Sequence, residues 1–125
     1  MFREILLNNL FVLLIYASAG LVVRHLTGSR LGAMAPWLVF GAHLVQIGVR
    51  VLNACQALGT LPCLALLLPH AWIELSGFSL GCWAGNRLYR GQLPLRQLAA
   101  AAVLIAVAAY TEAYITPFPF GHWLK

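Results

Sequence analysis

The chain has 125 residues, of which 62% are hydrophobic and 9% charged, with a mean hydropathy of +0.84 and a formal net charge of +5. A soluble domain of this length cannot bury so much apolar surface, so the composition predicts an all-α integral membrane protein with one domain over residues 1–125. The basic residues are scattered singly among apolar runs, without the clusters and interleaved aromatics of a nucleic-acid site. The charge therefore indicates contacts with lipid headgroups, and nucleic acid is excluded as a partner.

The first predicted membrane segment covers residues 5–23. It includes a small-residue triplet at 17–19 that resembles a signal-peptide cleavage site. The apolar run nevertheless continues to Arg24, about the length of one bilayer crossing. We therefore expect this first helix to be retained rather than cleaved.

Three more apolar segments follow, at residues 35–49, 61–84 and 98–115. The weakly polar stretch 50–59 reads as a bend or helix end, and Pro69 interrupts the third segment. Backbone amides in lipid must be paired internally, and the apolar residues do not alternate as in a β-barrel. The prediction is a helical bundle of about four transmembrane segments, the third broken at Pro69.

The basic residues do not decide how this bundle is oriented in the membrane. If the third segment crosses once, one side carries Arg24, Arg30, Arg87, Arg90 and Arg96. The other side then carries Arg3, Arg50 and Lys125. If the chain re-enters at Pro69 instead, the split is again five to three, so the positive-inside rule gives no choice.

Two of the three acidic residues, Glu74 and Glu112, fall within or at the end of apolar segments. A carboxylate at bilayer depth costs about 2.5–3.5 kcal/mol on insertion scales, so each must be protonated or partnered. Pro69 suits the first turn of a new helix, whose free N–H groups would attract anions. His70 and Glu74 lie one helical turn apart. We therefore expect Glu112 to pack against this helix start and to complete a buried polar cluster with His70 and Glu74.

Three glycines at four-residue spacing, Gly77, Gly81 and Gly85, follow the same helix. In membranes such a stripe lets another helix approach closely. The alanine-rich fourth segment is one possible counter-surface, and a second copy of the chain in a dimer is the other. The sequence leaves both open.

The sequence predicts no catalytic residue, because it lacks a nucleophile elbow, a P-loop and a dinucleotide-binding glycine pattern. Cys55, Cys63 and Cys82 form no CxxC pair, and we expect them to be small buried hydrophobic residues. The side chains with ligand chemistry for zinc or iron are His43, His70, Glu74 and Glu112. No metal is predicted, because neither HExxH nor a multi-histidine motif accompanies them.

Four short motifs are spread over most of the chain: "LLNNLFVLLI", "LNACQALG", "LLLPHAWIEL" and "TEAYITP". They resemble the Asn-Leu opening, the Asn-Gly turn, the Leu-Pro-His-Gly…Glu-Leu signature and the Glu-Ala-aromatic-X-Thr-Pro ending of the stage II sporulation protein M family. The matching residues are Asn9, Leu10, Asn53, Pro69, His70, Glu74, Leu75, Glu112, Ala113, Tyr114, Thr116 and Pro117. Ala54 and Ala71 stand where the family has glycine, as in a divergent, compact member.

The namesake of this family is an engulfment membrane component of endospore formers. It is similar to a scaffold that places peptidoglycan-degrading partners at the septum without cutting anything itself. The resemblance implies a non-catalytic, multi-pass protein of the cytoplasmic membrane that binds no cofactor. The partners expected are the lipid bilayer, a second copy of the chain in a homodimer, and other membrane or cell-envelope proteins.

Two other functions stay open at this point. An intramembrane metal-dependent enzyme would use His70, Glu74 and Glu112, with His43 as a further ligand. A small transporter or permease subunit is the other, because broken helices and midplane carboxylates are typical of transporters.

Overall fold

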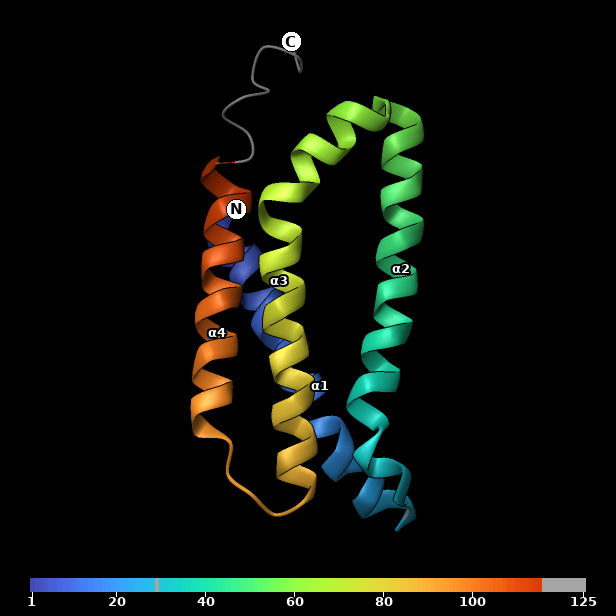
Figure 1. Ribbon diagram of the computed structural model, residues 1–125, viewed down its shortest axis with the longest axis vertical. Helices are drawn as coiled ribbons and strands as arrows, with labels where there is room; N and C mark the ends of the chain where they lie inside the picture. Colours follow the sequence, from blue (N-terminus) through green and yellow to red (C-terminus); the bar gives the residue numbers. More distant parts are fainter. Residues whose placement is uncertain (29, 116–125) are drawn as a thin grey trace.

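The computed structural model describes residues 1–28 and 30–115 and shows an all-α protein. Four helices are each long and apolar enough to span a membrane, as the sequence predicts. In chain order the elements are α1 (Phe2–Thr27), the 3₁₀ turn η1 (Arg30–Ala33), α2 (Ala35–Leu58), α3 (Thr60–Tyr89), α4 (Leu95–Tyr110) and the π turn η2 (Thr111–Ile115). The four long helices run alternately up and down (Figure 1).

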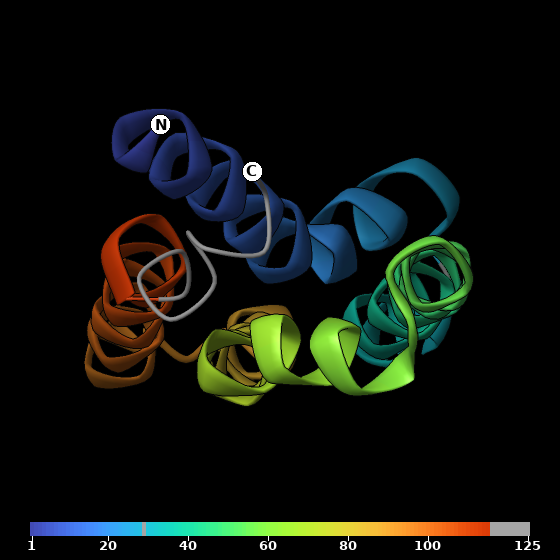
Figure 2. The same ribbon diagram turned by 90° about the horizontal axis from the view of Figure 1, so that it is seen from above.

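The α3 helix is the centre of this bundle, because it contacts α1, α2 and α4. Figure 2 shows α3 between α4 and α2, and α1 lies across from these three helices, running from beside α4 to beside α2. Among the described residues, α2 and α4 do not touch each other. In the most apolar 18-residue stretch of α2 only 6% of the residues are buried, against 33% for the span Leu95–Ile115. The α2 helix is therefore the least covered of the four.

The α2 helix is longer than the sequence predicts, because the stretch 50–59 is helical up to Leu58. Residues 50–58 contain neither proline nor glycine, and nothing in them breaks the backbone hydrogen bonds. The turn comes at Gly59, whose φ of 87° suits glycine and disfavours other residues. The predicted turn at Asn53 is therefore wrong, and this residue lies exposed on α2.

The interruption at Pro69 is a bend in α3 rather than the start of a new helix. The α3 helix begins at Thr60 and continues through Pro69, and its first third leans across toward the end of α2 (Figure 1). Proline removes one N–H and crowds the carbonyl of the residue four before it, which kinks a helix without ending it. The expected anion-attracting helix end at His70 is therefore wrong, because its backbone lies inside a helix.

The core is formed by side chains from all four long helices: Leu13, Tyr16, Phe40, Phe78, Cys82, Ala101 and Ile105. The glycine stripe of α3 is buried against this core. A Cβ on Gly77 would lie 3.1 Å from Cδ1 of Ile105, and one on Gly81 would overlap Cδ1 of Leu13. A Cβ on Gly85 would lie 3.1 Å from the carbonyl oxygen of Ala17. These close approaches are made within the chain, and the homodimer stays a prediction.

A disulfide joins Cys55 in α2 to Cys63 in α3, with their Cα atoms 5.1 Å apart. The two cysteines flank Gly59 by four residues on each side, so the tight turn between antiparallel helices places them opposite each other. The expectation that these cysteines are only small hydrophobic residues is therefore wrong for this pair, although Cys63 is buried as expected. Cys82 is free and buried, as expected.

Candidate functional site

A cavity lined by polar side chains lies between α1, α2, α3 and the π turn. Its volume is about 310 Å³. Its polar lining residues are Asn8, Asn9, His43, Arg50, His70, Glu74 and Glu112. This cavity is the candidate site, and below it is called the polar cavity. It is lined by the three residues that the sequence predicted to come together, with His70 and Glu74 from α3 and Glu112 from the π turn after α4.

The helical spacing explains how α3 contributes to this cavity. His70 and Glu74 are one turn apart, so both side chains project from the same face of α3, just after the bend at Pro69. Both are half-buried rather than fully enclosed. The bend tilts the start of α3 away from α4 and toward α2, which leaves room for polar groups beneath it.

Glu112 reaches the polar cavity from the π turn that follows α4. A π turn widens the helix by one residue and re-aims its side chains, and such turns are frequent at functional sites. Thr111 and Ala113 on either side of Glu112 are buried, and its own side chain is half-buried. The other two residues of this predicted motif, Thr116 and Pro117, lie outside the described residues.

The groups that line the polar cavity are close enough to influence one another. The side chain of Asn9, which is buried, forms a hydrogen bond with Glu74. Glu74 and Glu112 interact electrostatically, and Glu112 also interacts with His70. An amide donor and a histidine thus stand beside the two carboxylates, which is the compensation that charged groups at bilayer depth require. That these groups act as one closed polar cluster stays a prediction.

Tyr16 and His43 form a second polar contact, lower in the bundle, that the sequence did not predict. The Tyr16 hydroxyl and Nδ1 of His43 form a hydrogen bond between α1 and α2. The Tyr16 ring is only 1% exposed and meets the rings of Phe40 and Phe78 edge to face, with centroids 5.6 and 5.3 Å away. A tyrosine inside an apolar run was the available signal, because a buried phenol needs a hydrogen-bond partner.

A further cavity of about 480 Å³ lies beneath the leaning start of α3. It shares Arg50, His70 and Glu112 with the polar cavity, and Cys63 lines its upper part. The sequence treated Arg50 only as a topology signal. Its spacing of seven residues from His43 places both on one face of α2, and this spacing was the signal for a role at the site.

The space between α1 and α2 continues downward from the polar cavity as an open groove. This groove is lined by residues of α1 and α2: Val12, Ile15, Tyr16, Val39, Ala42, His43 and Gln46. His43 belongs to both the groove and the polar cavity. Below, these residues are called the α1–α2 groove.

No metal centre is assembled in the part of the chain that the structure describes. No three side chains among its His, Cys, Asp and Glu residues gather as metal ligands would. His43, which the metal hypothesis needs, instead directs Nδ1 to the Tyr16 hydroxyl. The arrangement thus supports a polar recess within the membrane, without a ligand set for zinc or iron.

Comparison with known proteins gives one family. The model of the family described as stage II sporulation protein M matches residues 1–117, which is nearly the whole chain. Neither curated protein sequences nor solved structures match the chain.

Proposed function

Because the chain belongs to the stage II sporulation protein M family, we propose that it is a non-catalytic membrane scaffold that holds a membrane-spanning helix of a partner protein in the α1–α2 groove. The chain is a multi-pass membrane protein whose described residues form helices, turns and short connections only. A protein that consists of membrane-spanning helices and short connections acts on a partner chiefly by binding it within or beside the bilayer. In a spore-forming host, the partners would be envelope-remodelling enzymes anchored in the cytoplasmic membrane.

The observation that carries this proposal is the polar, uncovered face of α2. Gln46, Arg50 and Asn53 are all exposed, although they lie within a helix that crosses the membrane. Hydrocarbon offers no hydrogen-bond partner to an amide or a guanidinium group. A partner helix with its own polar side chain would supply one, worth about 0.6–2 kcal/mol for each interhelical hydrogen bond.

The groove has the chemistry that such a helix requires. It is apolar along Val12, Ile15 and Val39, and it becomes polar at His43 and Gln46 where it meets the polar cavity. Membrane helices associate by close packing and by interhelical hydrogen bonds, because lipid gives no hydrophobic drive for their association. The partner helix would therefore present small apolar residues to the lower groove and one hydroxyl, amide or carboxyl group to Gln46 and Arg50.

The test is photo-crosslinking from within the groove in cells of the source organism. A photoreactive amino acid replaces Val39, which lines the groove and leaves the polar residues intact. The matched control carries the same group at Val103, an exposed apolar position on α4. We expect an adduct with a membrane-spanning protein from position 39, little from position 103, and loss of the adduct when Gln46→Leu is added.

Other outcomes of this experiment would reject the proposal. An adduct with lipid alone would mean that the groove faces the bilayer. An adduct with a second copy of the chain would replace the scaffold for other proteins by a homodimer. An adduct that persists unchanged in the Gln46→Leu protein would show that the polar face of α2 does not select the partner.

The polar cavity favours a second candidate function, a small transporter or permease subunit. Carboxylates and histidines within the span, here Glu74, Glu112 and His70, are typical of proton and ion pathways. Purified protein in liposomes would then conduct protons or a coupled solute, and Glu74→Gln would abolish the flux. Flux that is the same in wild-type and Glu74→Gln liposomes would leave the scaffold as the proposal.

A further inference from the structure

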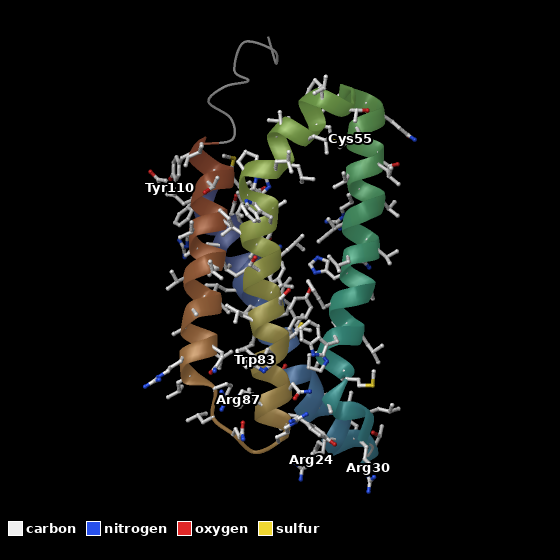
Figure 3. The ribbon with its side chains drawn as sticks, viewed as in Figure 1. Arg24, Arg30, Cys55, Trp83, Arg87 and Tyr110 are labelled. Carbon is white, nitrogen blue, oxygen red and sulfur yellow. A yellow bond between two sulfur atoms is a disulfide. The ribbon has the colours of Figure 1, made fainter. Side chains whose placement is uncertain are left out.

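The two ends of the bundle differ in charge. Five arginines gather at the lower end of Figure 1, where α1 and α3 finish and where α2 and α4 begin. These residues are Arg24, Arg30, Arg87, Arg90 and Arg96. None of the three acidic residues lies at this end, which below is called the arginine end. Figure 3 shows Arg24, Arg30 and Arg87 there, far from Cys55 and Tyr110.

The structure removes the ambiguity that the sequence left about these charges. The α3 helix crosses from one end of the bundle to the other without re-entering, so the arginine end keeps all five arginines. The described part of the opposite end carries Arg3 and, within its span, Arg50. Short loops rich in Arg and Lys stay on the cytoplasmic side of a membrane. Charge alone therefore assigns the arginine end to the cytoplasm.

The disulfide gives a second, independent indication. Cys55 and Cys63 lie at the end opposite the arginines, where the α2–α3 turn closes, and below this is called the cysteine end. Disulfides form and persist in extracytoplasmic compartments, and they are rare in a reducing cytosol. A bond at the cysteine end agrees with an arginine end in the cytoplasm, whereas the opposite orientation would place the bond in a reducing cytosol, where such bonds rarely persist.

We infer that the cysteine end faces the oxidising, extracytoplasmic side of the membrane, where a thiol–disulfide oxidoreductase closes the Cys55–Cys63 bond, and that the arginine end faces the cytoplasm. This inference does not depend on the proposed scaffold function. It adds that the polar cavity lies in the outer half of the membrane, because its lining residue Arg50 lies between His43 and the α2–α3 turn. It also assigns Cys55 and Cys63 a covalent modification, which is oxidation to a disulfide by a thiol–disulfide oxidoreductase.

The exposure of the two sulfurs suggests their order of reaction. Cys55 is partly exposed and Cys63 is buried, with 5% of its surface accessible. The Cys55 thiolate attacks the disulfide of the oxidoreductase and forms a mixed disulfide, and Cys63 then displaces the enzyme. The two cysteines lose two electrons and two protons, and the disulfide of the oxidoreductase takes them up to become a dithiol.

The bond also has a structural consequence. Cys63 lines the 480 Å³ cavity that lies between α2 and the leaning start of α3. Closing the bond holds the end of α2 against the start of α3, and both of these segments line the cavity.

The first test counts thiols in the wild-type chain, expressed in a bacterial host with its periplasmic thiol oxidase intact. Membranes are quenched with acid, denatured and alkylated with a maleimide that shifts the band on a gel. We expect one reactive thiol, Cys82, without reductant, and three after reduction. Cys55→Ser should raise the count without reductant to two. Deleting the thiol oxidase should lower the oxidised fraction, and three reactive thiols in the intact host would overturn the inference.

The second test measures orientation directly. In a Cys55→Ala/Cys63→Ala background, a new cysteine is placed at Glu4 or at Leu93, both exposed and at opposite ends of the bundle. An impermeant maleimide added to spheroplasts should label Glu4→Cys at once, and Leu93→Cys only after permeabilisation. Cys82 is fully buried and should stay unlabelled, which reports that the bundle is folded. The reverse pattern, or equal labelling of both positions, would overturn the inference.

Discussion

The hydroxyl of Tyr16 and Nδ1 of His43 form a hydrogen bond that joins α1 to the least covered helix of the bundle. This bond lies where the α1–α2 groove meets the polar cavity. The bond between Tyr16 and His43 therefore helps to fix the separation of α1 and α2 along the groove.

Replacing Tyr16 by phenylalanine should destabilise the protein by about 0.5–1.5 kcal/mol, because it removes the hydrogen bond and keeps the ring contacts with Phe40 and Phe78. Reversible unfolding in mixed micelles measures the change. Tyr110→Phe is the matched control, since that tyrosine is exposed on α4 and its ring packs on Phe2. Equal losses in the two variants would show that the Tyr16 hydroxyl contributes nothing specific.

Two adjacent asparagines in α1 offer a test of the contact with Glu74. Asn9 is buried and forms a hydrogen bond with Glu74, whereas Asn8 is exposed. Asn9→Ala should cost about 1–3 kcal/mol of unfolding free energy, because a carboxylate in the span loses its donor. Asn8 donates a hydrogen bond of 3.5 Å to Oδ1 of Asn9, and Asn8→Ala removes this bond while leaving the Asn9 amide beside Glu74, so it should cost less, about 0.5 kcal/mol.

The double variant Asn9→Ala/Glu74→Leu separates the hydrogen bond from simple packing, because leucine offers no acceptor to Asn9, whereas glutamine would still offer one. If the bond is the reason for the loss, the two changes should be non-additive, as expected for residues in direct contact. Additive effects would mean that Asn9 stabilises the helix pair without acting on Glu74.

The four membrane spans were predictable from sequence because each is an apolar run long enough to cross a bilayer. The end of α2 was not, since weak polarity in the stretch 50–58 resembles a turn while the only strong breaker is Gly59. That error also hid the disulfide. With a turn at Asn53, Cys55 falls outside the helix, and only a turn at Gly59 sets it opposite Cys63.

The candidate site was predictable in part. The spacing of His70 and Glu74 gave a shared face, and the need to compensate Glu112 suggested that it lies near them. Asn8 and Arg50 were missed because helical spacing tells which residues share a face, and does not tell which faces oppose one another. That information arises from tertiary packing, here from the way in which α3 bends at Pro69.

The glycine stripe of α3 should tolerate a methyl group very unevenly. Gly85→Ala places a Cβ against the carbonyl oxygens of Tyr16 and Ala17, which are backbone atoms that cannot move aside. We expect a loss of about 1–3 kcal/mol, the usual range for overpacking. Gly48→Ala in α2 is the control, because its Cβ meets nothing within 4 Å, and it should be neutral or stabilise by up to about 1 kcal/mol.

Gly81→Ala should be intermediate, because the obstructing atom is the tip of the Leu13 side chain. Leu13→Ala frees the space that this Cβ needs, so the losses of Leu13→Ala and Gly81→Ala should be less than additive, whereas those of Leu13→Ala and Gly85→Ala should add. If Gly81→Ala and Gly85→Ala were both harmless to the monomer and weakened self-association only, the stripe would belong to a dimer interface.

The bend at Pro69 should depend on the proline itself. Pro69→Ala restores an N–H that can donate to the carbonyl of Ala65 and removes the clash of the ring with that carbonyl, so α3 should straighten. Spectroscopic labels on unnatural amino acids at Leu61 and Trp83, both exposed and on opposite sides of the bend, measure this as a longer separation. The native cysteines stay unmodified in this design.

Pro62→Ala is the matched control for this change. Pro62 lies in the first turn of α3, where the N–H group of an alanine has no acceptor within the helix, so its replacement should leave the label separation unchanged. A separation that is the same in the wild-type, Pro69→Ala and Pro62→Ala proteins would mean that packing against α2, together with the Cys55–Cys63 bond, holds the bend without the proline.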